Sequence, residues 1–97
     1  MTSRRYAAVP ADRSFVALLR GVNIGKAKRV PMAELREIVE VLGGTGVATL
    51  LNSGNVVFRR PKASPARIAA ELSAAIERRL GIAVPVIAKT SAEFAAI

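Results

Sequence analysis

Two short segments of this chain combine glycine, asparagine and basic residues in the manner of an anion-binding loop. They are "RGVNIGKAKR", residues 20–29, and "NSGN", residues 52–55. Glycine lets backbone N–H groups turn inward, lysine and arginine supply positive charge, and asparagine and serine add neutral donors. The chemistry predicted is noncovalent binding of phosphate. The candidate binding residues are Arg20, Gly21, Asn23, Gly25, Lys26, Lys28, Arg29, Asn52, Ser53, Gly54 and Asn55.

A structural explanation for the same residues stays open. Glycines also serve ordinary turns, and basic residues are common in exposed loops. The spacing G-x-x-x-G is not the dinucleotide fingerprint, and the chain has no Walker pattern.

Covalent and metal chemistry have little support. The chain contains no histidine and no cysteine, so it lacks the usual general base, a thiolate and the commonest metal ligands. Glu37 and Glu40 are spaced as the solvated face of a helix, and Ser53 has no histidine to activate it. We therefore expect no catalytic residue, no metal and no cofactor, and we lean towards a protein that is not an enzyme.

The charge balance points to an anionic partner. The net charge is +8 and the sequence pI is about 11.4, which favours a phosphate-bearing small molecule or a nucleic acid. A merely soluble basic protein is the alternative. No apolar run approaches the roughly 18 residues of a membrane span, and residues 1–13 lack the apolar core of a signal peptide. These features predict a cytoplasmic protein that does not enter a membrane.

Hydrophobic periodicity supplies the elements that must position the two segments. Strands are expected at 14–20, 46–51, 55–59 and 82–88, and helices at 31–42 and 66–80. Ser64 and Pro65 predict the start of the second helix, and Gly81 predicts its end. Pro85, inside the last strand, favours a sheet edge. Another helix is expected to begin at Thr90 or Ser91.

The order β-α-β-β-α-β predicts an α+β fold, a ferredoxin-like two-layer sandwich. Its four-stranded antiparallel sheet carries both helices on one face. Right-handed crossovers put the first and third strands in the centre and the fourth at an edge. We expect residues 1–13 to form a flexible arm and residues 14–90 the domain. Residues 91–97 would begin a truncated helix that leads to a missing C-terminal portion.

This topology brings the two candidate segments to the same end of the domain. The loop after the first strand, the turn joining the second and third strands, and the loop after Arg79 must all lie there. The N-terminus of the first helix, with its partial positive charge, points to the same end. Arg59, Arg60 and Lys62 fall at the opposite end, where we expect them to be solvated.

The same stretches resemble a bacterial family known as domain of unknown function 1697. Its members carry segments of the types "LLRGINVGG", "VPMAELR" and "SGNVVF", matched in this chain by residues 18–25, 30–36 and 53–58. The family commonly has glycine where this chain has Lys26 and asparagine where it has Lys28. The resemblance implies a second α/β portion of similar size and no established activity.

Two further hypotheses follow. The fold order is shared with RNA-recognition domains, which stack bases on aromatic residues of the two central strands, and Phe15 and Phe58 are the candidates for that role. Alternatively, the chain is the structural half of a larger protein whose active site needs residues that it lacks. That hypothesis predicts exposed apolar surface and self-association.

Overall fold

The computed structural model describes residues 14–23, 29–50 and 54–95. In chain order the elements are β1 (Ser14–Leu19), α1 (Met32–Val41), β2 (Thr45–Leu50), β3 (Asn55–Arg59), α2 (Pro65–Leu80), β4 (Val86–Thr90) and α3 (Ser91–Ala95). The predicted order β-α-β-β-α-β is confirmed, and the short helix α3 follows it.

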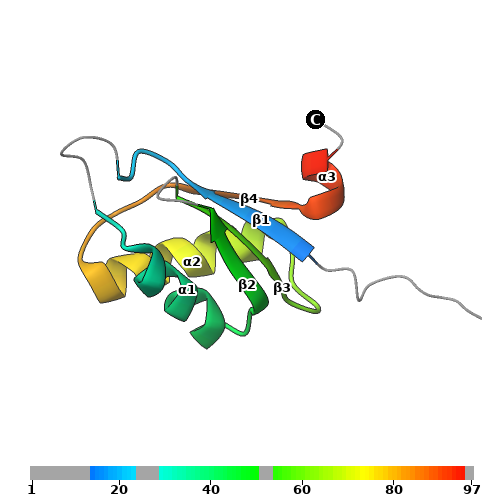
Figure 1. Ribbon diagram of the computed structural model, residues 1–97, viewed down its shortest axis with the longest axis horizontal. Coiled ribbons are helices and arrows are strands. Elements are labelled where there is room, and N and C mark those ends of the chain that lie inside the picture. Colours follow the sequence, from blue (N-terminus) through cyan, green and yellow to red (C-terminus); the bar gives the residue numbers. More distant parts are fainter. Residues whose placement is uncertain (1–13, 24–28, 51–53, 96–97) are drawn as a thin grey trace, which may run out of the picture.

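The strands form one four-stranded sheet in the order β2-β3-β1-β4, and each neighbouring pair is antiparallel. Helices α1 and α2 lie on one side of this sheet (Figure 1). The protein is therefore an α+β two-layer sandwich whose strand order is compatible with the ferredoxin-like prediction. As predicted, β1 and β3 are central and β4 is an edge strand.

The last strand begins later than the sequence pattern indicated. The prediction of a strand at 82–88 that contains Pro85 was wrong, because the strand runs from Val86 to Thr90. Pro85 has no N–H to donate, and its carbonyl accepts a hydrogen bond of 2.9 Å from the backbone N–H of Arg20. Pairing with β1 starts one residue later, where Val86 lies opposite Leu19.

Helix α2 begins and ends at the residues that the sequence predicted. The Ser64 hydroxyl accepts a hydrogen bond of 3.2 Å from the N–H of Arg67, and Pro65 occupies the first helical turn. At the other end Gly81 has φ = 72°, a left-handed conformation that glycine adopts at little cost. These residues therefore fix α2 by local interactions that the sequence makes visible.

Helix α1 begins one residue after its proline. Pro31 is the N-cap, in extended conformation, and provides no side-chain hydrogen bond. The helix ends at a glycine pair: Gly43 has φ = 98°, and the N–H of Gly44 donates to the carbonyl of Val39 at 2.9 Å. A side chain is excluded at Gly44, since its Cβ would lie 2.6 Å from Val39 Cγ1.

Helix α3 begins with reciprocal hydrogen bonds. The N–H of Glu93 donates to the Thr90 hydroxyl at 3.0 Å, and the N–H of Thr90 donates to the Glu93 carboxylate at 2.8 Å. Thr90, the first of the two predicted alternatives, is thus the cap. The hydrogen bond from the Thr90 backbone holds the pKa of Glu93 below its ordinary value.

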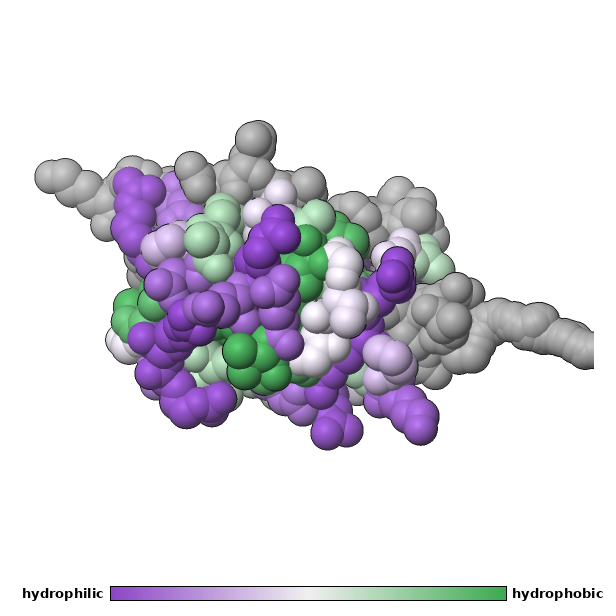
Figure 2. Space-filling view, turned by 60° about the horizontal axis from the view of Figure 1, so that its bottom comes forward, coloured by the Kyte–Doolittle hydropathy of each residue, from purple (hydrophilic) through white to green (hydrophobic). Residues whose placement is uncertain are grey.

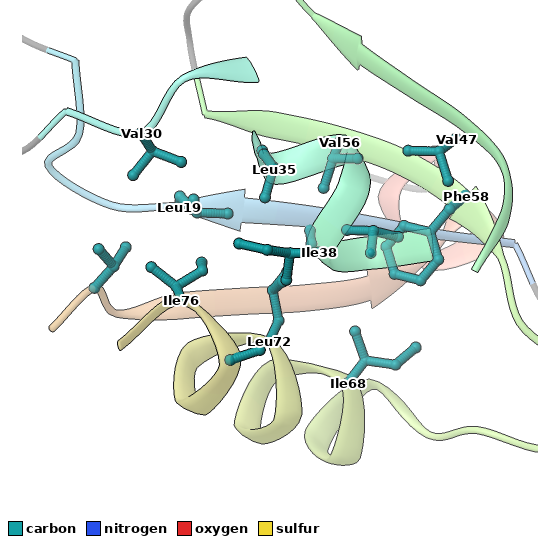
Figure 3. Packing of buried hydrophobic residues seen from close by; sticks show 14 of the residues in the cluster. Leu19, Val30, Leu35, Ile38, Val47, Val56, Phe58, Ile68, Leu72 and Ile76 are labelled. Atoms are coloured by element: carbon teal, nitrogen blue, oxygen red, sulfur yellow. The ribbon is translucent and has the colours of Figure 1, made fainter. Parts of the chain in front are cut away.

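The core lies between the sheet and the two long helices, and Figure 3 shows its side chains converging there from all of them. Strand residues alternate in direction, so the inward positions of β1 and β3 are buried while their neighbours face the other way. The largest side chains with less than 2% exposure are Phe15, Leu35, Leu72, Ile76, Val30, Val39, Val56 and Val84.

Candidate functional site

Three loops meet at one end of the sheet, on the left in Figure 1. The N–H of Leu19, the last residue of β1, donates to the carbonyl of Gly54 in the β2–β3 turn at 2.9 Å. The hydrogen bond between Arg20 and Pro85 ties the loop after α2 to the same place. We call this end the glycine-rich pole. Its described candidate residues are Arg20, Gly21, Asn23, Arg29, Gly54 and Asn55.

The convergence of these loops was predicted from topology and is confirmed by the two hydrogen bonds. The remaining candidates, Gly25, Lys26, Lys28, Asn52 and Ser53, lie outside the described residues.

Gly54 is a point of close contact between the β2–β3 turn and the loop after β1. It has φ = 81°, and a Cβ built on it would lie 2.7 Å from Val22 Cγ2 and 3.1 Å from the carbonyl oxygen of Leu19. Real Cβ atoms do not approach other heavy atoms at 2.7 Å, so any residue other than glycine requires a shift of the Val22 side chain or of the backbone. Gly54 therefore sets how closely the β2–β3 turn approaches the loop after β1.

Asn23 closes the loop that follows β1. Its Oδ1 accepts a hydrogen bond of 2.9 Å from the N–H of Val30, and its Nδ2 donates to the carbonyl of the same residue at 3.0 Å. The backbone of Asn23 has φ = 56°, a conformation that asparagine tolerates better than most residues. The sequence indicated Asn23 as a donor to a ligand, but its amide is used to join the two ends of the loop.

Two valines anchor the same loop in the core. Val22 is 3% exposed and Val30 is fully buried, as Figure 3 shows for Val30. Neither was predicted to be important, although an apolar residue at each end of a polar loop is a usable signal in the sequence. Because Pro31 and α1 follow directly, the anchored loop also fixes the N-terminus of α1 beside the pole.

The electrostatics of the pole combine two arginines and a helix end. Arg20 and Arg29 are exposed, and the first turn of α1 has no side-chain cap. Free N–H groups at a helix N-terminus carry a partial positive charge. Glu34 lies in that first turn and partly opposes the field, although its carboxylate is bonded to Arg79 Nε at 2.8 Å.

Arg79 joins the two long helices. It pairs with both Glu34 and Glu37 of α1, and its hydrogen bond to Glu37 raises the pKa of Arg79 above its ordinary value. Glu37, predicted to be a solvated residue, therefore has a partner on α2. The charge of Arg79 is compensated by these carboxylates, so Arg79 is a weaker candidate for binding an anion than the exposed Arg20.

A hollow of about 420 Å³ lies elsewhere, between α1 and α2. Its lining is mainly apolar, with Ile38 and Val41 from α1, the C-cap residue Leu42 and Ala75 from α2, beside Arg78 and Arg79. It includes no residue of the glycine-rich pole.

Figure 2 shows that the surface in view is largely hydrophilic and that its hydrophobic areas are small and separate.

The basic residues at the opposite end are not all solvated. Arg60 Nη1 lies 2.6 Å from Glu71 Oε1, and Arg67 Nε lies 2.8 Å from Glu71 Oε2. The prediction of a solvated cluster was therefore wrong for Arg60, whose side chain is only 17% exposed. The hydrogen bonds from Arg60 and then Arg67 hold the pKa of Glu71 below its ordinary value.

This arrangement makes the contribution of Glu71 dependent on pH. A lowered folded-state pKa stabilises the protein above the unfolded-state value of about 4.3, and the contribution is lost as the pH falls through the folded-state pKa. We expect Glu71→Gln to lower the urea midpoint at about pH 7 and to have little effect at about pH 3. Glu77→Gln, an exposed change on the same helix without an ion pair in the described chain, is the control. Equal effects of the two substitutions at neutral pH would contradict this assignment.

The structure rules out the proposed aromatic platform for RNA. Phe15 and Phe58 are 0% and 3% exposed, and their ring centroids lie 6.0 Å apart inside the core. Both side chains point to the side of the sheet that the helices cover. Bases cannot stack on them, so the hypothesis of an RNA-recognition sheet based on these residues was wrong.

Metal binding and membrane insertion have no visible basis in the described parts of the chain. No three His, Cys, Asp or Glu side chains gather there as a metal ion would need. Of the helices described, none has the length and hydropathy that a membrane crossing requires.

The chain is similar to a solved structure and to a family model. A solved structure, "The structure of conserved bacterial protein SP0830 from Streptococcus pneumoniae", matches with a TM-score of 0.71 and 29% sequence identity. The match covers 86% of this chain and 46% of that one, so this chain spans about half the length of its solved relative. A comparison with curated proteins gave no match. Residues 13–97 match the family model described as "Protein of unknown function (DUF1697)", and the chain belongs to that family.

Proposed function

We propose that the glycine-rich pole binds a phosphate-bearing ligand, a nucleotide or a nucleic acid, without catalysing a reaction. The observation that carries the proposal is the convergence of three loops where Arg20 and Arg29 are exposed beside the N-terminus of α1. Phosphate is the anion that such an arrangement of helix end, glycine and arginine suits best. Because these ligands are intracellular, we propose the cytoplasm as its location.

The overall charge supports the same ligand class. A chain of 97 residues with a net charge of +8 attracts polyanions from a distance and speeds their encounter. Lys26 and Lys28 lie in the sequence between Asn23 and Arg29, whose positions are described, and we propose that they add to the positive charge around the ligand.

A non-catalytic role agrees with the groups available. The chain has no histidine or cysteine. Glu34, Glu37 and Glu71 are each bonded to arginine, and Glu93 caps α3, so these carboxylates have structural partners. A general base near the pole is therefore not evident among them.

The test measures binding of ATP and of a labelled single-stranded oligonucleotide of about 12 nucleotides. We expect Arg20→Glu to weaken binding of the preferred probe about fivefold to tenfold and to reduce its salt dependence, because a phosphate contact is lost. Lys62→Glu is the matched control: it changes the net charge equally, and Lys62 lies in the turn that follows β3, at the end of that strand away from the pole. The two probes distinguish a nucleotide from a nucleic acid.

Two results would contradict the proposal. The first is that neither probe binds at low salt. The second is that Arg20→Glu and Lys62→Glu weaken binding equally, since that would reflect the total charge and not a site.

A second candidate function has one specific observation in its favour. The solved relative is about twice as long as this chain, so we propose that this unit is the structural half of a larger two-part protein. In that case the pole supplies part of a site that other residues complete. The test is whether the probes bind the longer relative at least tenfold more tightly than this chain, a difference of about 1.4 kcal/mol.

A further inference from the structure

The hollow between α1 and α2 is formed by matching positions on the two helices. The residues that line it are Ile38 and Val41 of α1 with the C-cap residue Leu42, and Ala75, Arg78 and Arg79 of α2. Each set has the spacing i, i+3, i+4, which puts its members on one face of the helix. We call this space the inter-helix hollow. Its volume of about 420 Å³ lies within the range of small-molecule sites, roughly 300–1,000 Å³.

The apolar part of this hollow is in contact with water. Val41 is 77% exposed, more than any other large apolar side chain in the described parts of the chain. Ile38 and Ala75 are buried, at 3% and 8% exposure, and therefore form the base of the hollow. A ligand that covers Val41 removes apolar surface from water on both sides of the contact, which favours an apolar ligand.

The charge in the lining is positive. Arg79 is bonded to Glu34 and Glu37 of α1, whereas Arg78 is exposed and has no ion pair with another described residue. Among the described residues that line the hollow there is no carboxylate. The inter-helix hollow thus presents one uncompensated arginine beside an apolar surface. That combination is complementary to a molecule with one negative charge and an apolar body.

A single free arginine favours a carboxylate over a phosphate as the charged group. A phosphate monoester carries about 1.5 to 2 negative charges at neutral pH, which one guanidinium does not neutralise. A carboxylate carries one charge, and its two oxygens accept the two parallel hydrogen bonds that an arginine can donate. The neighbouring Arg79 already binds carboxylates, those of Glu34 and Glu37.

Leu42 marks the apolar end of the hollow. Its half-buried side chain also lines a small cavity of about 10 Å³, whose other walls include the core residues Val39 and Leu72. A space of that size holds about one water molecule. It cannot accept an alkyl chain, so an apolar tail in the inter-helix hollow ends against Leu42.

We propose that the inter-helix hollow binds a small carboxylic acid with an apolar tail of about six to eight carbon atoms, a size that suits a site near the lower end of the volume range. Its carboxylate pairs with Arg78, and its tail covers Val41 and ends at Leu42. This proposal does not depend on the phosphate site, because no residue of the glycine-rich pole lines the hollow.

The experiment is an NMR titration of the isotope-labelled chain with octanoate, kept below its micelle concentration. We expect the largest amide shifts in residues 38–42 and 75–79 and a dissociation constant of about 1 mM, because an open site and a flexible tail limit the affinity. Octan-1-ol, titrated in parallel, has an apolar tail of similar length but no charge. It reports the apolar contribution alone.

Two variants test the two halves of the site. Arg78→Gln should weaken octanoate about threefold to fivefold, because an exposed ion pair is lost, and should change octan-1-ol binding less than about twofold. Val41→Glu should weaken both probes at least threefold, because it replaces apolar contact surface by a carboxylate. Both side chains are exposed, and thermal unfolding checks that each variant is folded.

Arg36→Gln is the matched control. It changes the net charge as Arg78→Gln does, and Arg36 is exposed on α1 without lining the hollow. Arg20→Glu should also leave octanoate binding unchanged, which separates this site from the pole.

Three results would overturn the proposal. The first is the absence of localised shifts at about ten times the expected dissociation constant, which would leave the hollow to an acidic segment of another polypeptide. The second is an equal loss in Arg78→Gln and Arg36→Gln, which would reflect total charge. The third is a set of shifts centred on residues 20–23, which would place octanoate at the glycine-rich pole.

Discussion

Replacing Gly54 with alanine should lower the free energy of unfolding by about 3 kcal/mol. Two costs add at this position. A left-handed conformation costs an alanine roughly 1 kcal/mol, and forcing a methyl group into an occupied space costs roughly 1–3 kcal/mol. The methyl group would lie 2.7 Å from Val22 Cγ2 and 3.1 Å from the carbonyl oxygen of Leu19, with φ at 81°. Urea unfolding followed by circular dichroism measures the loss.

Gly21→Ala is the matched control for this experiment. Gly21 has φ = 71°, close to that of Gly54, but among the described residues, its two chain neighbours aside, no heavy atom lies within 4 Å of the Cβ that alanine would add. It should therefore lose only the conformational part, about 1 kcal/mol. If the two variants are equally stable, the contact between the β2–β3 turn and Val22 is looser than the structure indicates.

The consequence of Gly54→Ala extends to the proposed binding site. The hydrogen bond from Leu19 to the Gly54 carbonyl joins two loops of the pole, and a methyl group at Gly54 pushes them apart. We therefore expect weaker anion binding in this variant even under conditions where it remains folded. Gly21→Ala should retain more of the binding, because it leaves that contact unchanged.

The parts of the fold that the sequence predicted well are those fixed by local chemistry. The Ser64 cap and the Gly81 stop each depend on residues that are neighbours along the chain. The β-α-β-β-α-β order then left few topologies, and the strand order followed from handedness. For the same reason the meeting of three loops at one pole was predictable.

The errors lie where interactions between distant residues decide the outcome. The start of β4 is shifted because Pro85 has no N–H to donate to the sheet, although its carbonyl still accepts a hydrogen bond from Arg20, about 65 residues away in the chain. Arg60 forms an ion pair with Glu71 of α2, and Arg79 of α2 forms ion pairs with Glu34 and Glu37 of α1. Hydrophobic periodicity does not reveal these pairs, because they depend on how the elements pack. Hydrophobic periodicity indicates which face of a helix or strand is buried. It does not indicate which charged residues form ion pairs between the packed elements.

Asn23 was predicted from the sequence to donate to a ligand, whereas in the structure its side chain is hydrogen-bonded to the backbone of Val30. Replacing it with alanine should lower the free energy of unfolding by about 2–3 kcal/mol. The side chain forms hydrogen bonds with both the N–H and the carbonyl of Val30, and unpaired groups beside a buried residue cost roughly 1 kcal/mol or more each. Alanine at φ = 56° adds roughly 1 kcal/mol of strain.

Two further variants separate these contributions. Asn23→Gly loses the same hydrogen bonds but accepts the left-handed backbone, so it should be about 1 kcal/mol more stable than Asn23→Ala. Asn55→Ala removes an amide at the same pole that has no hydrogen bond in the described structure, and it should cost less than about 0.5 kcal/mol. Chemical denaturation of the three variants under identical conditions gives the comparison.

Binding measurements on the same variants address function. If Asn23 only joins the ends of its loop, Asn23→Ala and Asn23→Gly should weaken phosphate binding by similar factors, because both release the loop from Val30. If the amide instead contacts the ligand, the loss should remain when the loop is closed by other means, such as a disulfide in a variant with paired cysteines. The native chain has no cysteine, so that disulfide would form without competition. Recovery of binding on oxidation would establish that Asn23 acts by holding the loop between β1 and α1 in place, and persistent loss would assign it to the ligand.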